Sequence, residues 1–437
     1  MVFSFTKLIS AFLAFLTLFA STYEVNIEKD LSDTTEIIET TETEHNEDDN
    51  ITGDDDIVTR IANPIPEDQL ADVFAKAVAE FSDTLYCKTA EHNTDKSNLV
   101  LSPLSAYYAL SLIANGAGGD TLNEIETALG NIPVEQLNEY LSALTDRLTS
   151  NDGSKVVVGN STWTNSERFI LSEKFIDTAA KYYDAEAVSL PFNNSALGKI
   201  NGWVKEKTDG MIPSILNELD SKATMVLINT ILFDGKWEKE YTKQQISDGM
   251  FYNYDGTASE AEFLFSEESG SYFTVNGGVG FTKKYKGGFR FTAVLPSGNI
   301  DDFMDNLDID SIIDASFNPR GNVKTYIPKF EYEYFADLTN MLKSMGIESA
   351  MTNSADFYSL SADGETNSRI DSVIQKAKIT LTEKGTKAAA ATAIVTYGTT
   401  AMPPKNVPVI RLDRPFFYMI VDEAGIPLFV GTVYSLN

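Results

Sequence analysis

The side chains that most often carry out covalent catalysis are scarce in this chain. Its 437 residues include one cysteine, Cys87, and two histidines, His45 and His92. His45 lies in an acidic stretch and His92 in a polar one, so no Ser-His-Asp or Cys-His arrangement can form in a folded core. A zinc site built from histidine and cysteine is excluded for the same reason. Carboxylate chemistry stays open, but no paired-acid motif stands out, and we expect a protein that is not an enzyme and holds no metal or cofactor.

A different kind of chemistry is indicated by residues 383–404, a long segment of small and mostly uncharged side chains. Four consecutive alanines, Ala388–Ala391, favour a helix, whereas the β-branched residues on both sides favour strands. Gly398 and the pair Pro403-Pro404 are turn formers near the end of the segment. A connection longer than about 12–15 residues without structure of its own is usually functional or disordered.

These conflicting signals agree if the segment is a latent strand, which can join a sheet but is not part of one in the folded chain. Side chains alternate between the two faces of a strand, and this strand would place its only charge, Lys387, on the face towards water. The opposite face would consist of small or apolar side chains, which are Thr386, Ala388, Ala390, Thr392, Ile394 and Thr396. Such a face could slide beneath a packed sheet. The alternative, a low-complexity linker, has no need to confine its charge to one face.

The elements that must position this segment are a mixture of helices and strands. Apolar spacing predicts helices over residues 71–85, 105–116, 121–129, 134–148 and 336–345. Strands are predicted over residues 156–163 and 373–382, and the second of these runs directly into the segment. Helices and strands alternate without a βαβ rhythm, which argues for the α+β class.

The first 66 residues divide into two segments that we do not expect to join the folded domain. Residues 1–20 have Lys7 followed by a short apolar run, which is typical of a secretory signal peptide. Leu18 stands where cleavage prefers a small residue, so an uncleaved anchor is the alternative. Residues 21–66 are rich in Thr, Glu and Asp and poor in apolar side chains, so we expect them to be disordered.

The remaining residues, 67–437, are expected to form the folded domain of a secreted, extracellular protein. With one cysteine the domain has no intrachain disulfide and depends on its core for stability. The net charge of −30 argues against nucleic acids and heparin-like polyanions as partners. We further expect a monomer without membrane association once the signal peptide is removed.

Several motifs in this domain resemble those of serpins, the family of serine-protease inhibitors. The first resembles the hinge of the serpin reactive-centre loop and consists of Glu383, Gly385, Thr386, Ala388, Ala389, Ala390, Ala391 and Thr392. Others lie at residues 225–237, 414–417 and 427–433, so that the resemblance covers nearly all of residues 67–437. It implies a serpin fold with three β-sheets, about eight or nine helices and an exposed reactive-centre loop at about residues 383–413.

The resemblance also implies two places where the central sheet opens to admit the loop. The upper one, the breach, would contain Trp237, Lys329 and Glu383, with an ion pair between Lys329 and Glu383 that holds the sheet closed. The alternative is an ordinary surface pair, which contributes about 0–1 kcal/mol. The second place, the shutter, would be a buried hydrogen-bonded cluster formed by Ser102, Ser105, Asn229 and Gln375. Gln375 stands where many relatives carry a histidine, and it can donate and accept hydrogen bonds but cannot titrate.

The mechanism that the resemblance implies is suicide inhibition of a target serine protease, with which the chain would form a covalent complex. Family spacing from Glu383 predicts the reactive bond at Thr399–Thr400, and a small residue before the cut suits elastase-like or subtilisin-like proteases. Tyr397–Gly398 is the alternative bond and would suit chymotrypsin-like proteases. The alternative function is that of a non-inhibitory serpin, which acts as a binding, chaperone or storage protein.

Overall fold

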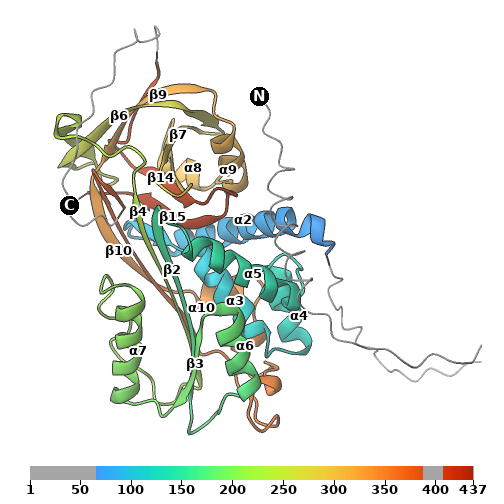
Figure 1. The fold of residues 1–437 in the computed structure, drawn as a ribbon. Helices are drawn as coiled ribbons and strands as arrows, with labels where there is room; N and C mark the ends of the chain where they lie inside the picture. Colours follow the sequence, from blue (N-terminus) through green and yellow to red (C-terminus); the bar gives the residue numbers. More distant parts are fainter. Residues whose placement is uncertain (1–64, 387–406, 437) are drawn as a thin grey trace, which may run out of the picture. The chain divides into compact units, whose positions relative to one another are not determined.

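A computed structural model describes residues 65–386 and 407–436, which form a mixture of helices and β-sheets (Figure 1). The α+β class expected from the sequence is confirmed. The α-helices within the described ranges are α2 (Glu67–His92), α3 (Pro103–Ala114), α4 (Gly119–Ala128), α5 (Val134–Thr149), α6 (Glu173–Tyr183), α7 (Asn194–Lys207), α8 (Ile300–Met304), α9 (Ile309–Phe317) and α10 (Thr339–Ser344). Across these ranges, no helix has the length and apolar character needed to span a membrane.

The central sheet has six strands in the order β10-β11-β12-β4-β2-β3. Their bounds are β2 (Ser154–Asn165), β3 (Glu186–Leu190), β4 (Met225–Lys236), β10 (Phe330–Asp337), β11 (Ser372–Thr382) and β12 (Gly385–Thr386). Strands β11 and β4 pair directly and in parallel from Ser372 to Gln375, opposite Val226 to Asn229. Towards their other ends the two strands diverge, and the two-residue strand β12 lies between them.

The second sheet has nine strands, where the resemblance implied two separate sheets. It contains β1 (Leu99–Leu101), β5 (Ile246–Tyr252), β6 (Ala258–Val275), β7 (Gly278–Lys284), β8 (Arg290–Pro296), β9 (Gly321–Pro328), β13 (Val409–Arg411), β14 (Phe416–Val421) and β15 (Pro427–Val433). Within the described residues, the two smaller sheets that the resemblance implied are therefore continuous with each other. The reason is the length of β6, whose first part pairs with β5 and β9 and whose last part pairs with β7. The register of β6 shifts between Glu268 and Tyr272, so this one strand joins the group that contains β5 and β9 to the group that contains β7.

Two predicted helices differ from the structure by more than two residues at one end or both. The helix predicted over 71–85 extends from Glu67 to His92, and it begins after Pro66 with acidic residues in its first turn, where they interact favourably with the helix dipole. The helix predicted over 336–345 is wrong at its start, because β10 continues to Asp337 and pairs there with β11. Pairing with a neighbouring strand has overridden the apolar spacing of this segment.

Both faces of the central sheet are covered by helices. On one face lies α3, which is buried along its entire length and packs against β2 and β4. On the other face α7 contributes Ile200, Trp203 and Val204 to a second apolar cluster with Val226 and Ile228 of β4 (Figure 1). Strand β4 is consequently buried on both sides, which explains its continuous apolar sequence.

Candidate functional site

The start of the predicted hinge is already part of the central sheet. Gly385 and Thr386 pair with Lys236 and Gly235 of β4 and with the end of β11. The side chain of Thr386 is buried, and its hydroxyl lies 2.6 Å from the Tyr285 hydroxyl. These two residues therefore correct the prediction of an exposed loop that begins at Glu383. The divergence of β11 and β4 leaves backbone hydrogen-bonding groups that β12 satisfies.

Gly385 adopts a backbone conformation that residues with a side chain rarely take, with φ of +148°. A Cβ atom at this position would also lie 1.9 Å from the carbonyl oxygen of Gly235. Glycine is thus required where the chain turns back to enter the sheet. At the far end of the predicted loop, Val409–Arg411 form strand β13 rather than loop, because they pair with Lys324–Tyr326 of β9.

The three predicted breach residues lie together at the entrance to the hinge. The Nζ atom of Lys329 lies 2.9 Å from Glu383 Oε2 and 3.0 Å from Glu262 Oε2, so the expected ion pair is present and is shared with a second acid. Trp237 is fully buried, and its indole N–H donates to the carbonyl of Thr382 at 2.9 Å. The breach therefore fixes both the side chain of Glu383 and the backbone immediately before it.

Electrostatics at the breach follow from this geometry. The hydrogen bond from Lys329 lowers the pKa of Glu383, and partial burial only partly opposes that shift. Partial burial lowers the pKa of Lys329, but its hydrogen bonds to Glu383 and Glu262 outweigh it, so the pKa is raised. A hollow of about 450 Å³ in front of the pair is lined by Glu383 and Glu262 and by Tyr241, Lys243, Ile246, Ser247 and Asp248.

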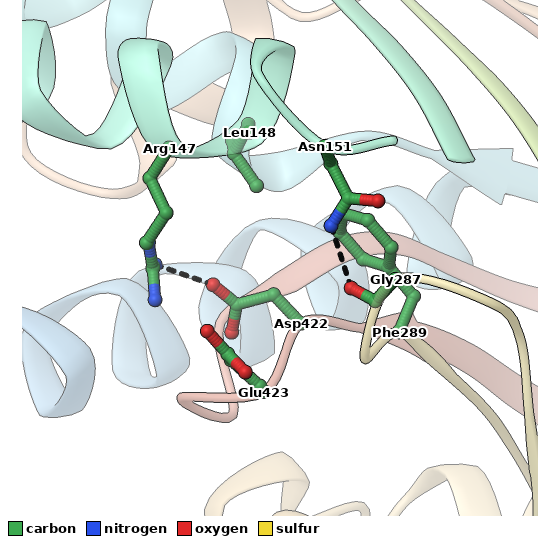
Figure 2. A pocket seen from close by; sticks show the side chains of 7 residues that line it. All are labelled: Arg147, Leu148, Asn151, Gly287, Phe289, Asp422 and Glu423. Carbon is green, nitrogen blue, oxygen red and sulfur yellow. Dashed lines mark hydrogen bonds and ion pairs between the residues drawn. The ribbon is translucent and has the colours of Figure 1, made fainter. Parts of the chain in front are cut away.

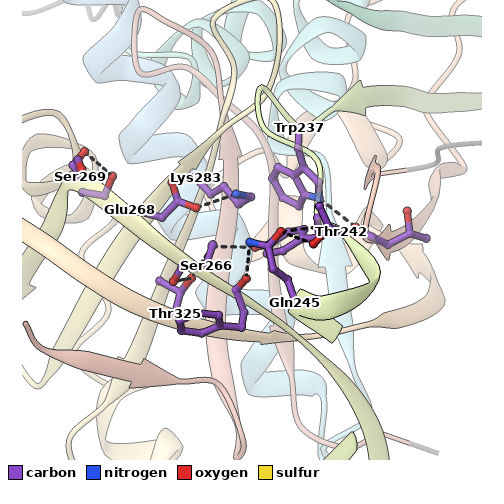
Figure 3. Close-up of polar contacts among 12 residues, drawn as sticks. Trp237, Thr242, Gln245, Ser266, Glu268, Ser269, Lys283 and Thr325 are labelled. Carbon is purple, nitrogen blue, oxygen red and sulfur yellow. Dashed lines mark hydrogen bonds and ion pairs between the residues drawn. The ribbon is translucent and has the colours of Figure 1, made fainter. Parts of the chain in front are cut away.

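A buried polar cluster beneath the breach was not predicted from the sequence. Lys283 of β7 is 3% exposed, and its Nζ lies 2.7 Å from Glu268 Oε1 of β6. Figure 3 shows this pair close to Trp237, with Ser266 and Thr325 nearby. The alternation of β7 is a signal that could have found it, because Lys283 lies two residues after the buried Phe281 and so faces the same side.

The four predicted shutter residues are in contact with one another. The side chain of Gln375 accepts from the backbone N–H of Ser102 at 2.9 Å and donates to the Ser102 carbonyl at 2.9 Å and to Asn229 Oδ1 at 2.7 Å. The Ser105 hydroxyl donates to the same Asn229 oxygen at 3.1 Å. All four residues are buried. The cluster joins β11, β4 and the start of α3, where Ser102 is the N-cap residue.

A small hollow elsewhere in the domain holds an ion pair whose acid is buried and whose arginine is 35% exposed. Arg147 at the end of α5 lies 2.5 Å from Asp422 in the turn between β14 and β15, and Asn151 donates to the carbonyl of Gly287 (Figure 2). Burial raises the pKa of Asp422, which also accepts from the backbone N–H groups of Ala424 and Ile426. These contacts fix a turn, and we assign them a structural role.

The remaining predicted site residues lie outside the described residues. They are Ala388, Ala389, Ala390, Ala391 and Thr392 of the hinge, Thr399 and Thr400 at the predicted reactive bond, and Tyr397 and Gly398 at the alternative bond. The structure therefore places the breach, the shutter and the first hinge residues at the central sheet and leaves the reactive bond as a prediction.

Comparison with known proteins identifies this arrangement. Residues 76–436 match the family model described as "Serpin (serine protease inhibitor)". The chain belongs to the serpin family. Serpin-Z1B of Triticum aestivum is 28% identical over 364 residues, which cover 78% of this chain and 90% of that protein. Alpha-1-antiproteinase of Rattus norvegicus is 28% identical over 368 residues, which cover 82% of this chain and 87% of that protein.

Solved serpin structures share the fold over most of the chain. The thermophilic serpin tengpin in its native state matches with a TM-score of 0.78 and 36% identity, covering 87% of this chain and 98% of that one. Tengpin in its latent state matches with a TM-score of 0.71 and 33% identity, covering 86% of this chain and 100% of that one. The serpin described here is therefore more similar to the native state than to the latent state.

Proposed function

We propose that this serpin is a suicide inhibitor of serine proteases. The observation that carries the proposal is the two-residue strand β12, which forms the first rungs of a strand between β11 and β4. Thr386 is buried in the sheet while the chain is uncut, and the small side chains that follow it in the sequence can continue the same strand. The family membership supports a target protease as the partner.

The proposed reaction begins when the serine hydroxyl of the target attacks the carbonyl carbon of the residue before the reactive bond. The peptide C–N bond breaks, the new amino group leaves with the proton, and an acyl ester joins the protease to the upstream part of the loop. That part then inserts as a strand between β11 and β4 and draws the protease along. The complex is trapped if insertion is faster than hydrolysis of the ester by water.

Thr399–Thr400 is the bond that we propose is cut. The small side chain of Thr399 suits elastase-like and subtilisin-like proteases, and Gly398 before it gives the loop freedom to fit a protease cleft. Tyr397–Gly398 remains the alternative bond. Cleavage after Lys405 by trypsin-like proteases lies too far along to leave an inserted strand of the usual length.

Incubation of the purified protein with elastase, subtilisin, chymotrypsin and trypsin tests the proposal. The expected result on a denaturing gel is a covalent complex with elastase or subtilisin. Mass spectrometry of the C-terminal fragment released from that complex should find Thr400 at its start. A fragment that begins at Gly398 would move the target towards chymotrypsin-like proteases. Clean cleavage by all four enzymes without a complex would contradict inhibition and favour a non-inhibitory role.

We further propose that the inhibitor is secreted and acts outside the cell. The apolar segment in residues 1–20 after Lys7 supports this. N-terminal sequencing of the protein recovered from the medium of the producing cell tests it, and a mature chain that begins after residue 20 is the expected result. Retention of the whole chain inside the cell would contradict it.

A further inference from the structure

We propose that Lys283 and Glu268 are positioning residues for loop insertion, because their ion pair holds the segment that fixes the start of the hinge. The inference rests on the proposed function, since the positioning matters only in a serpin whose loop enters the sheet. It concerns the relative rates of insertion and hydrolysis rather than the choice of target.

The start of the hinge is held by one short segment, Trp237–Tyr241. The backbone N–H of Trp237 donates to the carbonyl of Lys384 at 2.9 Å, and its indole N–H donates to Thr382 at 2.9 Å. The backbone N–H of Tyr241 donates to the carbonyl of Glu383 at 2.9 Å. Three successive carbonyls at the turn between β11 and β12 are thus bound by two residues, which makes this turn the fixed point from which an inserted strand lengthens.

The aromatic rings of the same two residues face the ammonium group of Lys283. Its Nζ lies 4.4 Å from the centre of the Tyr241 ring and 5.5 Å from that of Trp237. Both distances are within the range of cation–π attraction, which is stronger where the cation is shielded from water. Burial lowers the pKa of Lys283, and the carboxylate of Glu268 opposes that shift and keeps the cation over the rings.

The segment is anchored to the neighbouring strand β6 as well. The Tyr241 hydroxyl lies 3.3 Å from that of Ser266, and Gln245 donates to the carbonyl of Phe265 at 3.1 Å. Lys283 on β7 and Glu268 on β6 complete this support from beneath (Figure 3). The ion pair therefore connects the second sheet to the turn from which the hinge enters the central sheet.

Loss of the ion pair would take the cation away from the rings of Trp237 and Tyr241. The Trp237 ring is also stacked on Tyr285, with ring centres 4.2 Å apart, so the Tyr241 ring would be the freer of the two to shift. The backbone N–H of Tyr241 would then hold the Glu383 carbonyl less firmly, and β12 would hold its register with β4 less firmly. Insertion would slow, whereas acylation and hydrolysis take place on the protease and keep their rates. A larger share of the acyl-enzyme would be hydrolysed, so the ratio of cleaved inhibitor to covalent complex would rise.

The test uses the full chain with Lys283→Met and Glu268→Gln combined, which removes both charges and keeps similar side-chain volumes. After reaction with subtilisin, the ratio of cleaved inhibitor to covalent complex on a denaturing gel should rise several-fold over that of the wild type. The rate at which the loop is first attacked should stay the same. The matched control is Arg147→Met with Asp422→Asn, which removes the partly buried ion pair between α5 and the β14–β15 turn. This control should change the melting temperature without changing the ratio.

An unchanged ratio in the Lys283 and Glu268 double variant would overturn the inference, and so would an equal rise in both double variants. If the double variant does not fold, Glu268→Gln alone is used, and it should raise the ratio by a smaller factor. An unchanged ratio in that single variant overturns the inference too. A wild-type protein that forms no complex with any protease of the panel contradicts the proposed function itself, whereas a normal wild type beside an unaltered variant contradicts only the role of the ion pair.

Discussion

At the scale of single residues, Thr386 is the hinge residue whose side chain is buried in the sheet. Its side chain is buried and bonded to Tyr285, so an arginine there would place an unpaired charge in the core, at a cost of several kcal/mol. Thr386→Arg should abolish the covalent complex on a denaturing gel while the loop is still cut. Thr149→Arg at the exposed end of α5 is the control and should leave the complex unchanged. An undiminished complex with Thr386→Arg would falsify the insertion mechanism.

The ion pair between Glu383 and Lys329 predicts a dependence of stability on pH. The pKa of Glu383 is lowered from its usual value of 4.5 by Lys329. The stabilisation is therefore complete above pH 4.5 and is lost as the pH falls through the lower pKa of the folded state. Both side chains are partly exposed, so the effect is about 0–1 kcal/mol. Glu383→Gln should melt slightly below the wild type at pH 7, and the difference should disappear once the pH is below the lowered pKa of Glu383 in the folded state. A difference that is constant with pH would contradict this assignment.

At the scale of elements, we expect the shutter cluster to hold β11 and β4 together. Gln375→Met keeps the shape of the side chain but removes its three hydrogen bonds and leaves buried groups of Ser102 without that partner. We expect the free energy of unfolding to fall by about 2–4 kcal/mol, since each buried unsatisfied group costs about 1–3 kcal/mol. The midpoint of urea unfolding measures it, and the exposed substitution Gln69→Met serves as the control. Equal midpoints for the two variants would mean that the cluster does not hold the strands.

Local sequence could predict the elements whose signals are local. The apolar runs of β2 and β11 and the helical spacing of α5 were sufficient for their placement. The breach and shutter residues came from the family resemblance and not from local sequence. The sharing of β6 between two groups of strands could not be predicted, because it depends on which strands lie beside each half of it. The burial of Thr386 could not be predicted either, since it results from the divergence of β11 and β4.

At the scale of the whole molecule, the central sheet has room for one more strand only if β11 and β4 separate along their paired ends. Cutting the loop between Ala393 and Met402 frees its upstream part to extend β12 and form backbone ladders with both neighbours. A gain of several kcal/mol would raise the melting temperature by about 5–10 °C in a domain of this size. Calorimetry before and after the cut measures it. Equal melting temperatures would rule out insertion.

The close approach of the Gly385 and Gly235 backbones limits which substitutions such a protein can accept in evolution. A methyl group on Gly385 would collide with the backbone of Gly235, and this position needs a positive φ as well. The substitution Gly385→Ala would therefore prevent the hinge from pairing in the sheet, while the residues around the proposed reactive bond stay unchanged. The protease would still bind and cleave this variant, but it would release it as a cleaved substrate without being trapped. Inhibitory lineages should accordingly lack side chains at the position of Gly385, and a relative with alanine there that still traps its protease would refute this constraint.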